Sequence, residues 1–368
     1  MTKPSLKLAL CLAAAIIPAA AQSAAEPRMN QVQVLGSHNS YKQAIDPSLW
    51  SLLMKTGDTR LLGIEYSHLP IEKQLDMGLR ALEIDVVYDP KGGLYAHPKG
   101  IESVKEAGLP AAPPYDPEGM MRQPGFKVMH MPDIDFRSNA YTLRQELAIL
   151  KAWSDKHPHH LPIPVTMNAK DTGIDRPGYV QPLKFDKAAF DAWDAELIEG
   201  MGRDKLITPD DVRGSWPSLE AAVLAQAWPT LSRVRGKFFF VLDETGEKQS
   251  TYLAGHPSLA GRVMFVNATE GRPEAAFRIV NEPKEDWNYI QYLVRSGYYV
   301  RTRADADTKE ARAGDYSRLR AALISGAQVI STDYYVPDPK LETGYVVKLT
   351  ARWNPLLPPE ERPLPAIE

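Results

Sequence analysis

Two histidines and two carboxylates follow or end strand-like segments in the first half of the chain. They are His38, Glu83, Asp85 and His130. Histidine exchanges protons near neutral pH, and paired carboxylates bind a cation or shift each other's pKa. Together these side chains are the minimum set for metal-assisted cleavage of a phosphodiester. The sequence therefore predicts an active site assembled from the ends of several strands.

The two carboxylates also indicate which metal such a site would take. Glu83 and Asp85 lie two residues apart, and side chains at that spacing share one face of a strand. With the amide oxygen of Asn39, they form a shell made only of oxygen ligands. Such a shell suits Ca²⁺, or Mg²⁺, better than Zn²⁺.

Further polar side chains stand at the ends of the later strand-like segments. Cations such as Lys170, Arg301 and Arg303 hold phosphate oxygens in many proteins, so we expect them to bind substrate. Asp243 and Asp333 end two other segments and complete the predicted substrate-binding set.

The elements that must position these residues alternate between strands and helices. Helical patterns fill the gaps between the strand candidates, which favours a (β/α)8 barrel of the α/β class, with its site at the carboxyl ends of the strands. An open doubly wound sheet is the alternative, but no glycine-rich phosphate loop follows the first strand. The eight strand candidates are 32–35, 81–87, 126–129, 163–168, 238–242, 263–266, 299–302 and 328–332. Helix candidates include 141–156, 185–201, 273–281 and 287–296.

Two long stretches rich in proline and glycine interrupt this alternation. They are 89–125 and 171–184, and we expect both to be loops at the mouth of the barrel.

The chain begins with the pattern of a cleavable signal peptide. A basic start, an apolar run and small residues fill positions 1–25, so we expect a periplasmic or secreted protein. Residues 26–354 are expected to form one catalytic domain, followed by a proline-rich tail at 355–368. The one cysteine, Cys11, lies in the leader, so we expect no disulfide after cleavage. The formal net charge of −3 gives no reason to expect nucleic-acid binding, and the oligomeric state is left open.

Three motifs, taken together and in this order, resemble a known family. They are SHNSY at 37–41, LEID at 82–85 and FKVMHMPDID at 126–135. The chain resembles the bacterial calcium-dependent phosphoinositide-specific phospholipase C family, from about residue 30 to about residue 335.

This resemblance implies a barrel enzyme that cleaves a phosphoinositide to diacylglycerol and an inositol phosphate. It implies acid–base roles for His38 and His130. From the residues alone, His97 competes for the second role. It also implies that Asn39, Glu83 and Asp85 hold calcium. Eukaryotic members of the superfamily have one more acidic ligand at the end of the fourth strand, and here the matching residue, Asn168, would be a neutral calcium ligand.

Two other readings stay open from the sequence. Glycerophosphodiester phosphodiesterases and sphingomyelinase D-like enzymes share the order His, E-x-D, His, although the former usually carry His-Arg where this chain has His38-Asn39. The chain is alternatively an inactive barrel that binds a lipid or a sugar phosphate. In each case the expected partner is a phospholipid or another phosphodiester, met at a membrane surface only transiently.

Overall fold

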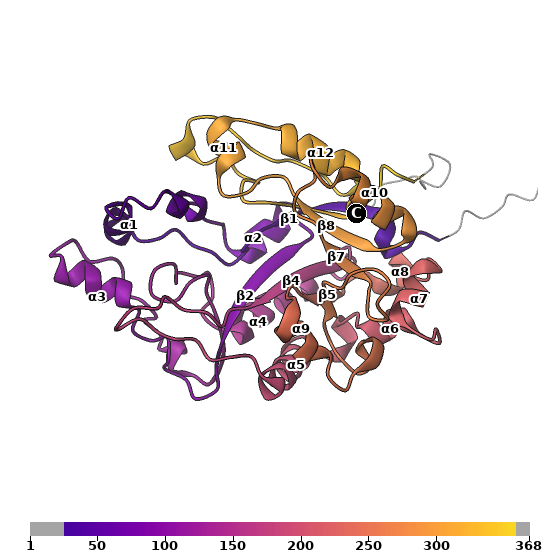
Figure 1. The fold of residues 1–368 in the computed structure, drawn as a ribbon, viewed down its shortest axis with the longest axis horizontal. Coiled ribbons are helices and arrows are strands. Elements are labelled where there is room, and N and C mark those ends of the chain that lie inside the picture. The colour runs from indigo at the N-terminus through magenta and orange to yellow at the C-terminus, as the bar shows by residue number, and fades with distance from the viewer. Residues whose placement is uncertain (1–25, 358–368) are drawn as a thin grey trace, which may run out of the picture.

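Parallel strands close into a barrel in residues 26–357, the part of the chain described by the computed structural model (Figure 1). Each strand runs parallel to its neighbours in the barrel, as the sequence predicts for a (β/α)8 fold. These strands are β1 (Val32–Ser37), β2 (Leu82–Asp89), β4 (Ile163–Ala169), β5 (Phe238–Leu242), β6 (Phe265–Val266), β7 (Phe277–Ile279), β8 (Tyr299–Arg303) and β9 (Val329–Thr332).

The barrel closes through two narrow contacts. One half runs β1-β9-β8-β7 and the other runs β2-β4-β5-β6, and single bridges at Gly36–Ala81 and Asn267–Phe277 join them. A Cβ atom at position 36 would lie 2.7 Å from the Cβ of Ala81. Glycine is therefore required here, because the two strands approach each other too closely for any side chain.

Two predicted elements are wrong. The segment 126–129 is not a barrel strand: β3 (Gly125–Val128) pairs antiparallel with the far end of β2, and periodicity alone does not give strand direction. The predicted helix 273–281 instead contains β7, because pairing with β8 overrides the local helical propensity.

Helices occupy most of the connections between barrel strands. α4 (Leu143–Lys156) shows the local logic: Thr142 and Gln145 form a capping box at its start. Its apolar side chains, Leu143, Leu147 and Leu150, are fully buried. The other helices are α1 (Pro47–Met54), α2 (Ile71–Asp76), α3 (Lys99–Glu106), α5 (Lys187–Met201), α6 (Pro209–Arg213), α7 (Leu219–Leu224), α8 (Leu231–Val234), α9 (Gly246–Leu253), α10 (Trp287–Ser296), α11 (Lys309–Ala313) and α12 (Ser317–Ser325).

A second, smaller apolar cluster supports the long loops around α1 and α3. These two helices project to one side of the barrel (Figure 1). Leu49 of α1 and Val104 of α3 pack with Tyr95, Met129 and Phe136. The loop that leads to His130 is therefore anchored by its own core.

The two ends of the chain lie mostly outside the described residues. β10 (Arg352–Trp353) pairs antiparallel with β1 near the carboxyl end. The predicted signal peptide lies outside the described residues, as does most of the predicted tail. In the part that is described, no helix is long and apolar enough to cross a membrane.

Candidate active site

The turn after β1 presents His38 at the mouth of the barrel. Asn39 has a positive φ of 46°, a conformation that asparagine tolerates better than most residues. The backbone N–H of Ser40 donates to the carbonyl of Glu83 (2.8 Å), and its Oγ accepts from the N–H of Glu83 (2.8 Å). These bonds fix the turn to β2, which explains the serine in the motif.

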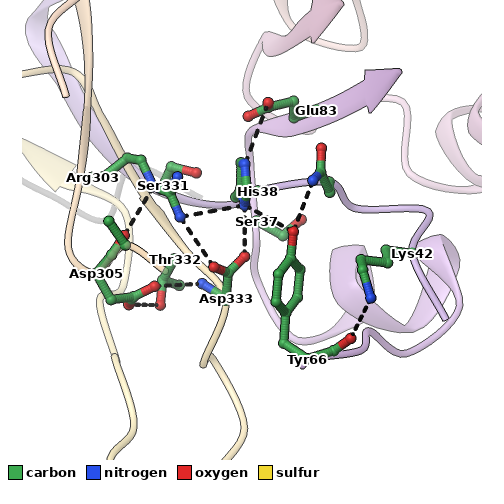
Figure 2. A network of polar contacts seen from close by, with 12 residues as sticks. Ser37, His38, Lys42, Tyr66, Glu83, Arg303, Asp305, Ser331, Thr332 and Asp333 are labelled. Atoms are coloured by element: carbon green, nitrogen blue, oxygen red, sulfur yellow. Dashed lines mark hydrogen bonds and ion pairs between the residues drawn. The ribbon is translucent and has the colours of Figure 1, made fainter. Parts of the chain in front are cut away.

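His38 is oriented by a buried carboxylate from the end of β9. Its Nδ1 lies 2.9 Å from Oδ1 of Asp333, and its Nε2 lies 3.8 Å from Oε1 of Glu83 (Figure 2). We assign the proton to Nδ1 because a carboxylate can only accept it. Nε2 then carries a free lone pair. Burial and the nearby Arg303 lower the pKa of His38 well below its usual value, so the ring is neutral at pH 7.

A polar network stands behind Asp333. Arg303 donates to Oδ2 of Asp333 (3.1 Å), and the backbone N–H of Asp333 donates to Asp305 (2.8 Å). Thr332 also donates to Asp305. Burial and the charge of Asp333 raise the pKa of Asp305 to about 7. Arg303 thus fixes the carboxylate of Asp333, and Asp305 fixes its backbone (Figure 2).

Two residues between β1 and α2 also hold His38. His68 donates from Nε2 to the backbone carbonyl of His38 (2.7 Å), and burial lowers the pKa of His68 to about 4. The hydroxyl of Tyr66 accepts from Nδ2 of Asn39 (2.8 Å) and lies 3.3 Å from Nδ1 of His38.

The second histidine has a similar arrangement. Nδ1 of His130 lies 2.8 Å from Oδ2 of the buried Asp135, and the buried ammonium of Lys42 lies 3.3 Å from Oδ1 of Asp135. Burial acts to raise the pKa of Asp135, but Lys42 and His130 outweigh it and lower that pKa. His97, the competing candidate, is exposed on the loop after β2. The structure thus gives His130, and not His97, a carboxylate partner.

The two carboxylates of β2 are each paired with a cation. Oε2 of Glu83 accepts from Arg301 of β8, and its Oε1 accepts from Nδ2 of Asn168 (3.3 Å). Oδ2 of Asp85 lies 3.0 Å from Nζ of Lys170 and accepts from the hydroxyl of Tyr41 (3.0 Å).

These ion pairs decide whether the predicted calcium ligands are free to bind the ion. One buried oxygen, Oδ1 of Asp85, lacks a hydrogen-bond partner and is free to accept. Ca²⁺ takes six to eight oxygens, however, and the other three carboxylate oxygens of Glu83 and Asp85 already accept from cations or hydrogen-bond donors. Among the described residues, no three acidic or histidine side chains gather as a metal site. As arranged, these residues do not fit the ion.

The remaining predicted substrate-binding residues differ in how far their side chains are exposed to solvent. Asp243 accepts from Asn267 (3.2 Å), and burial raises its pKa. Arg301 and Asp333 are almost fully buried in ion pairs, whereas the side chain of Lys170 is one-third exposed.

Two hollows open beside the two histidines. Tyr66 and Asp333, which contact His38, line the first together with apolar side chains that include Trp50, Ile64 and Val336. The second is more polar, and its lining includes His130, Asn168, Lys170 and Lys248.

Sequence reasoning missed several residues that hold the histidines. Tyr66 and His68 lie in an irregular segment with no periodic signal, and Asp305 follows β8 without a motif. Asp135 lies inside the motif that contains His130, so its spacing from that histidine was an available signal.

Comparison with known proteins supports the fold and identifies a family. The family model described as "Phosphoinositide phospholipase C, Ca2+-dependent" matches residues 27–355. A calcium-dependent phosphoinositol-specific phospholipase C from Pseudomonas sp., solved with myoinositol, is similar in structure, with a TM-score of 0.52 and 18% identity over 90% of this chain and 96% of that one.

A Ca²⁺-dependent phosphatidylinositol-specific phospholipase C from Streptomyces antibioticus has a TM-score of 0.52 and 17% identity, over 86% of this chain and 97% of that chain. At these identities the two solved structures support the fold alone. Comparison with curated protein sequences finds no significant match. The family match spans nearly the whole described chain, and the chain therefore belongs to the Ca²⁺-dependent phosphoinositide phospholipase C family, whose members are phosphoric diester hydrolases.

Proposed function

We propose that this protein cleaves a phosphoinositide between its phosphate and diacylglycerol, with His38 and His130 as the acid–base pair. One observation carries the proposal: each histidine is held at Nδ1 by a buried carboxylate. Each Nε2 is thereby left to exchange protons with a substrate. Family membership and the names of the structurally similar enzymes supply the substrate class.

The first step is attack of the inositol 2-hydroxyl on phosphorus, which expels the diacylglycerol oxygen. His38 takes the proton of the hydroxyl at Nε2, because its low pKa leaves it neutral at pH 7. His130 gives a proton to the departing oxygen. The products are diacylglycerol and a cyclic inositol phosphate, which water opens with the two histidines in exchanged roles.

The two hollows support one orientation of the substrate. The polar hollow beside His130 offers Lys170 and Asn168 to phosphate oxygens and hydroxyls. The hollow beside Asp333 includes apolar side chains such as Trp50 and Val336, which suit the glycerol end of a lipid. Arg303 lies next to His38 and adds a positive charge near the phosphate.

The test is hydrolysis of phosphatidylinositol vesicles by the purified protein and by three histidine variants. We expect His38→Ala and His130→Ala each to lower turnover at least a hundredfold, since acid–base assistance is typically worth about 10²–10⁴ in rate. His159 is exposed in the loop after α4, so His159→Ala is the matched control. Near-normal turnover by His38→Ala refutes the mechanism.

A panel of headgroups separates this function from the alternatives. Glycerophosphodiesters and sphingomyelin are the competing substrates, and product formation from either one alone would replace the phosphoinositide. Binding of phosphatidylinositol without any product would favour an inactive lipid-binding barrel.

We also propose that the protein is exported and acts at a membrane surface that it meets transiently. The signal-peptide pattern of residues 1–25 supports export. Cell fractionation with mass spectrometry of the mature amino terminus tests it, and an intact leader on cytoplasmic protein would contradict it.

A further inference from the structure

We infer that Lys170 and Arg301 neutralise the carboxylates of Glu83 and Asp85 in this active site, in place of a divalent metal ion. The inference concerns this chain alone and differs from the calcium dependence that the family description gives. Its catalytic part rests on the proposed function, whereas its metal-binding part does not.

The first argument is charge balance at the end of β2. Glu83 pairs with Arg301, and their side chains are only 6% and 4% exposed. Asp85 is 1% exposed and pairs with Lys170 at 3.0 Å. Two negative charges therefore face two positive charges. Adding a divalent cation would leave this buried group with two uncompensated positive charges, which is unfavourable out of water.

The second argument is the chemistry of the remaining donors. A calcium site needs oxygens that are free to coordinate, yet Oε1 of Glu83 already accepts an N–H of the Asn168 amide (3.3 Å). Position 168 would supply a third negative charge if it were acidic, and here it is neutral. Oδ1 of Asp85 is the one carboxylate oxygen of Glu83 and Asp85 without a hydrogen-bond partner, and a single carboxylate oxygen does not make a calcium site.

The third argument is that Lys170 is placed to reach a substrate. Its ammonium has three N–H donors, and the contact with Asp85 uses one of them. Its side chain is 32% exposed and lines the same hollow as His130. A phosphate oxygen in that hollow would meet a fixed positive charge that Asp85 holds in position.

The first experiment titrates the purified full chain with Ca²⁺, by calorimetry and by thermal unfolding. We expect no saturable binding and no change of Tm up to millimolar Ca²⁺. A ligand that binds only the folded state raises Tm with its concentration, so the absence of a shift is informative. A calcium-dependent rise in Tm that Asp85→Asn abolishes would overturn the inference.

A double variant tests the ion pairs directly. Asn168→Glu/Lys170→Gln adds a carboxylate and removes the ammonium, and we expect it to gain calcium binding with a Tm that rises with Ca²⁺. Gln181→Glu/Lys184→Gln makes the same charge change at exposed loop positions and should gain nothing. If the folded double variant binds no Ca²⁺, the ion pairs are not what excludes the metal, and the inference fails. The wild-type titration decides the question even if the variant does not fold.

Activity separates this inference from the proposed function. We expect equal hydrolysis of phosphatidylinositol in Ca²⁺ and in excess chelator. Hydrolysis only with Ca²⁺ would overturn the inference and leave the proposed function standing. If neither condition gives product, the proposed function fails, and the wild-type titration alone judges the inference.

Discussion

Glu146 on α4 should make the protein less stable as the pH rises, and Glu146→Gln should remove this effect. The side chain is 0% exposed, and neither carboxylate oxygen has a hydrogen-bond partner of ordinary geometry. Burial, with a smaller contribution from Glu72, raises its pKa from 4.5 to about 8. At pH 7 the folded protein therefore holds a proton that the unfolded chain releases.

The sign and size follow from that difference in bound protons. Below pH 4.5 the Glu146 carboxyl is neutral in both the folded and the unfolded chain, so it costs no stability. As the pH rises toward the folded-state pKa of about 8, the unfolded chain loses this proton first and the free energy of unfolding falls. Each pH unit in this window lowers the free energy of unfolding by about 1.4 kcal/mol, which gives an upper bound of about 5 kcal/mol. Glutamine has nearly the same shape and no charge at any pH.

Urea unfolding at pH 5, 7 and 9 measures the effect. We expect Glu146→Gln to match the wild type near pH 5 and to exceed it by several kcal/mol at pH 9. The control is Glu199→Gln on α5, whose carboxylate is 72% exposed and should show no such pH dependence. A difference between Glu146→Gln and wild type that is the same at pH 5 and pH 9 would refute the reasoning.

Three further predictions concern the active site and the closure of the barrel. Asp333→Asn should lower kcat about a hundredfold or more with little change in KM, because His38 loses the carboxylate that fixes its tautomer. A rise in KM as large as the fall in kcat would contradict this. The acid limb of the pH profile of kcat/KM should have its midpoint below pH 6.5, because burial and Arg303 lower the pKa of His38 and the ring must be neutral to act as a base. A midpoint above pH 6.5 would exclude His38 as the base. Gly36→Ala should lower the free energy of unfolding by about 1–3 kcal/mol, measured by urea unfolding, because its Cβ would lie 2.7 Å from that of Ala81; wild-type stability would show that β1 can move away.

The sequence predicted the barrel because its longer strands are nearly continuous apolar runs. All five residues of β5 are buried, for example, and a strand buried on both faces is typical of a parallel barrel. β7 was missed because it has three residues, too few for a periodic signal. β3 was recognised as a strand, but its antiparallel direction depends on how the loop 90–124 folds back, which no local pattern encodes.

The candidate site was predictable where strand order alone brings residues together. β1 and β9 are neighbours with Ser37 opposite Thr332, so the next residues, His38 and Asp333, meet at the same edge. Contacts that depend on side-chain reach were not predictable. Arg301 lies 218 residues from Glu83, and only the closed barrel brings the two side chains into one buried ion pair.

Four buried carboxylates of the site each have a cation, and this balance bears on how His38 can work there at neutral pH. The pairs are Glu83–Arg301, Asp85–Lys170, Asp333–Arg303 and Asp135–Lys42. An unpaired carboxylate beside a histidine would raise the pKa of that histidine and keep it protonated. Because a cation offsets its charge, Asp333 orients His38 without holding it in the charged form. The phosphodiester of a substrate would then bring a negative charge that these pairs do not already balance. The part-exposed ammonium of Lys170 lies in the hollow of His130 and is placed to meet that charge.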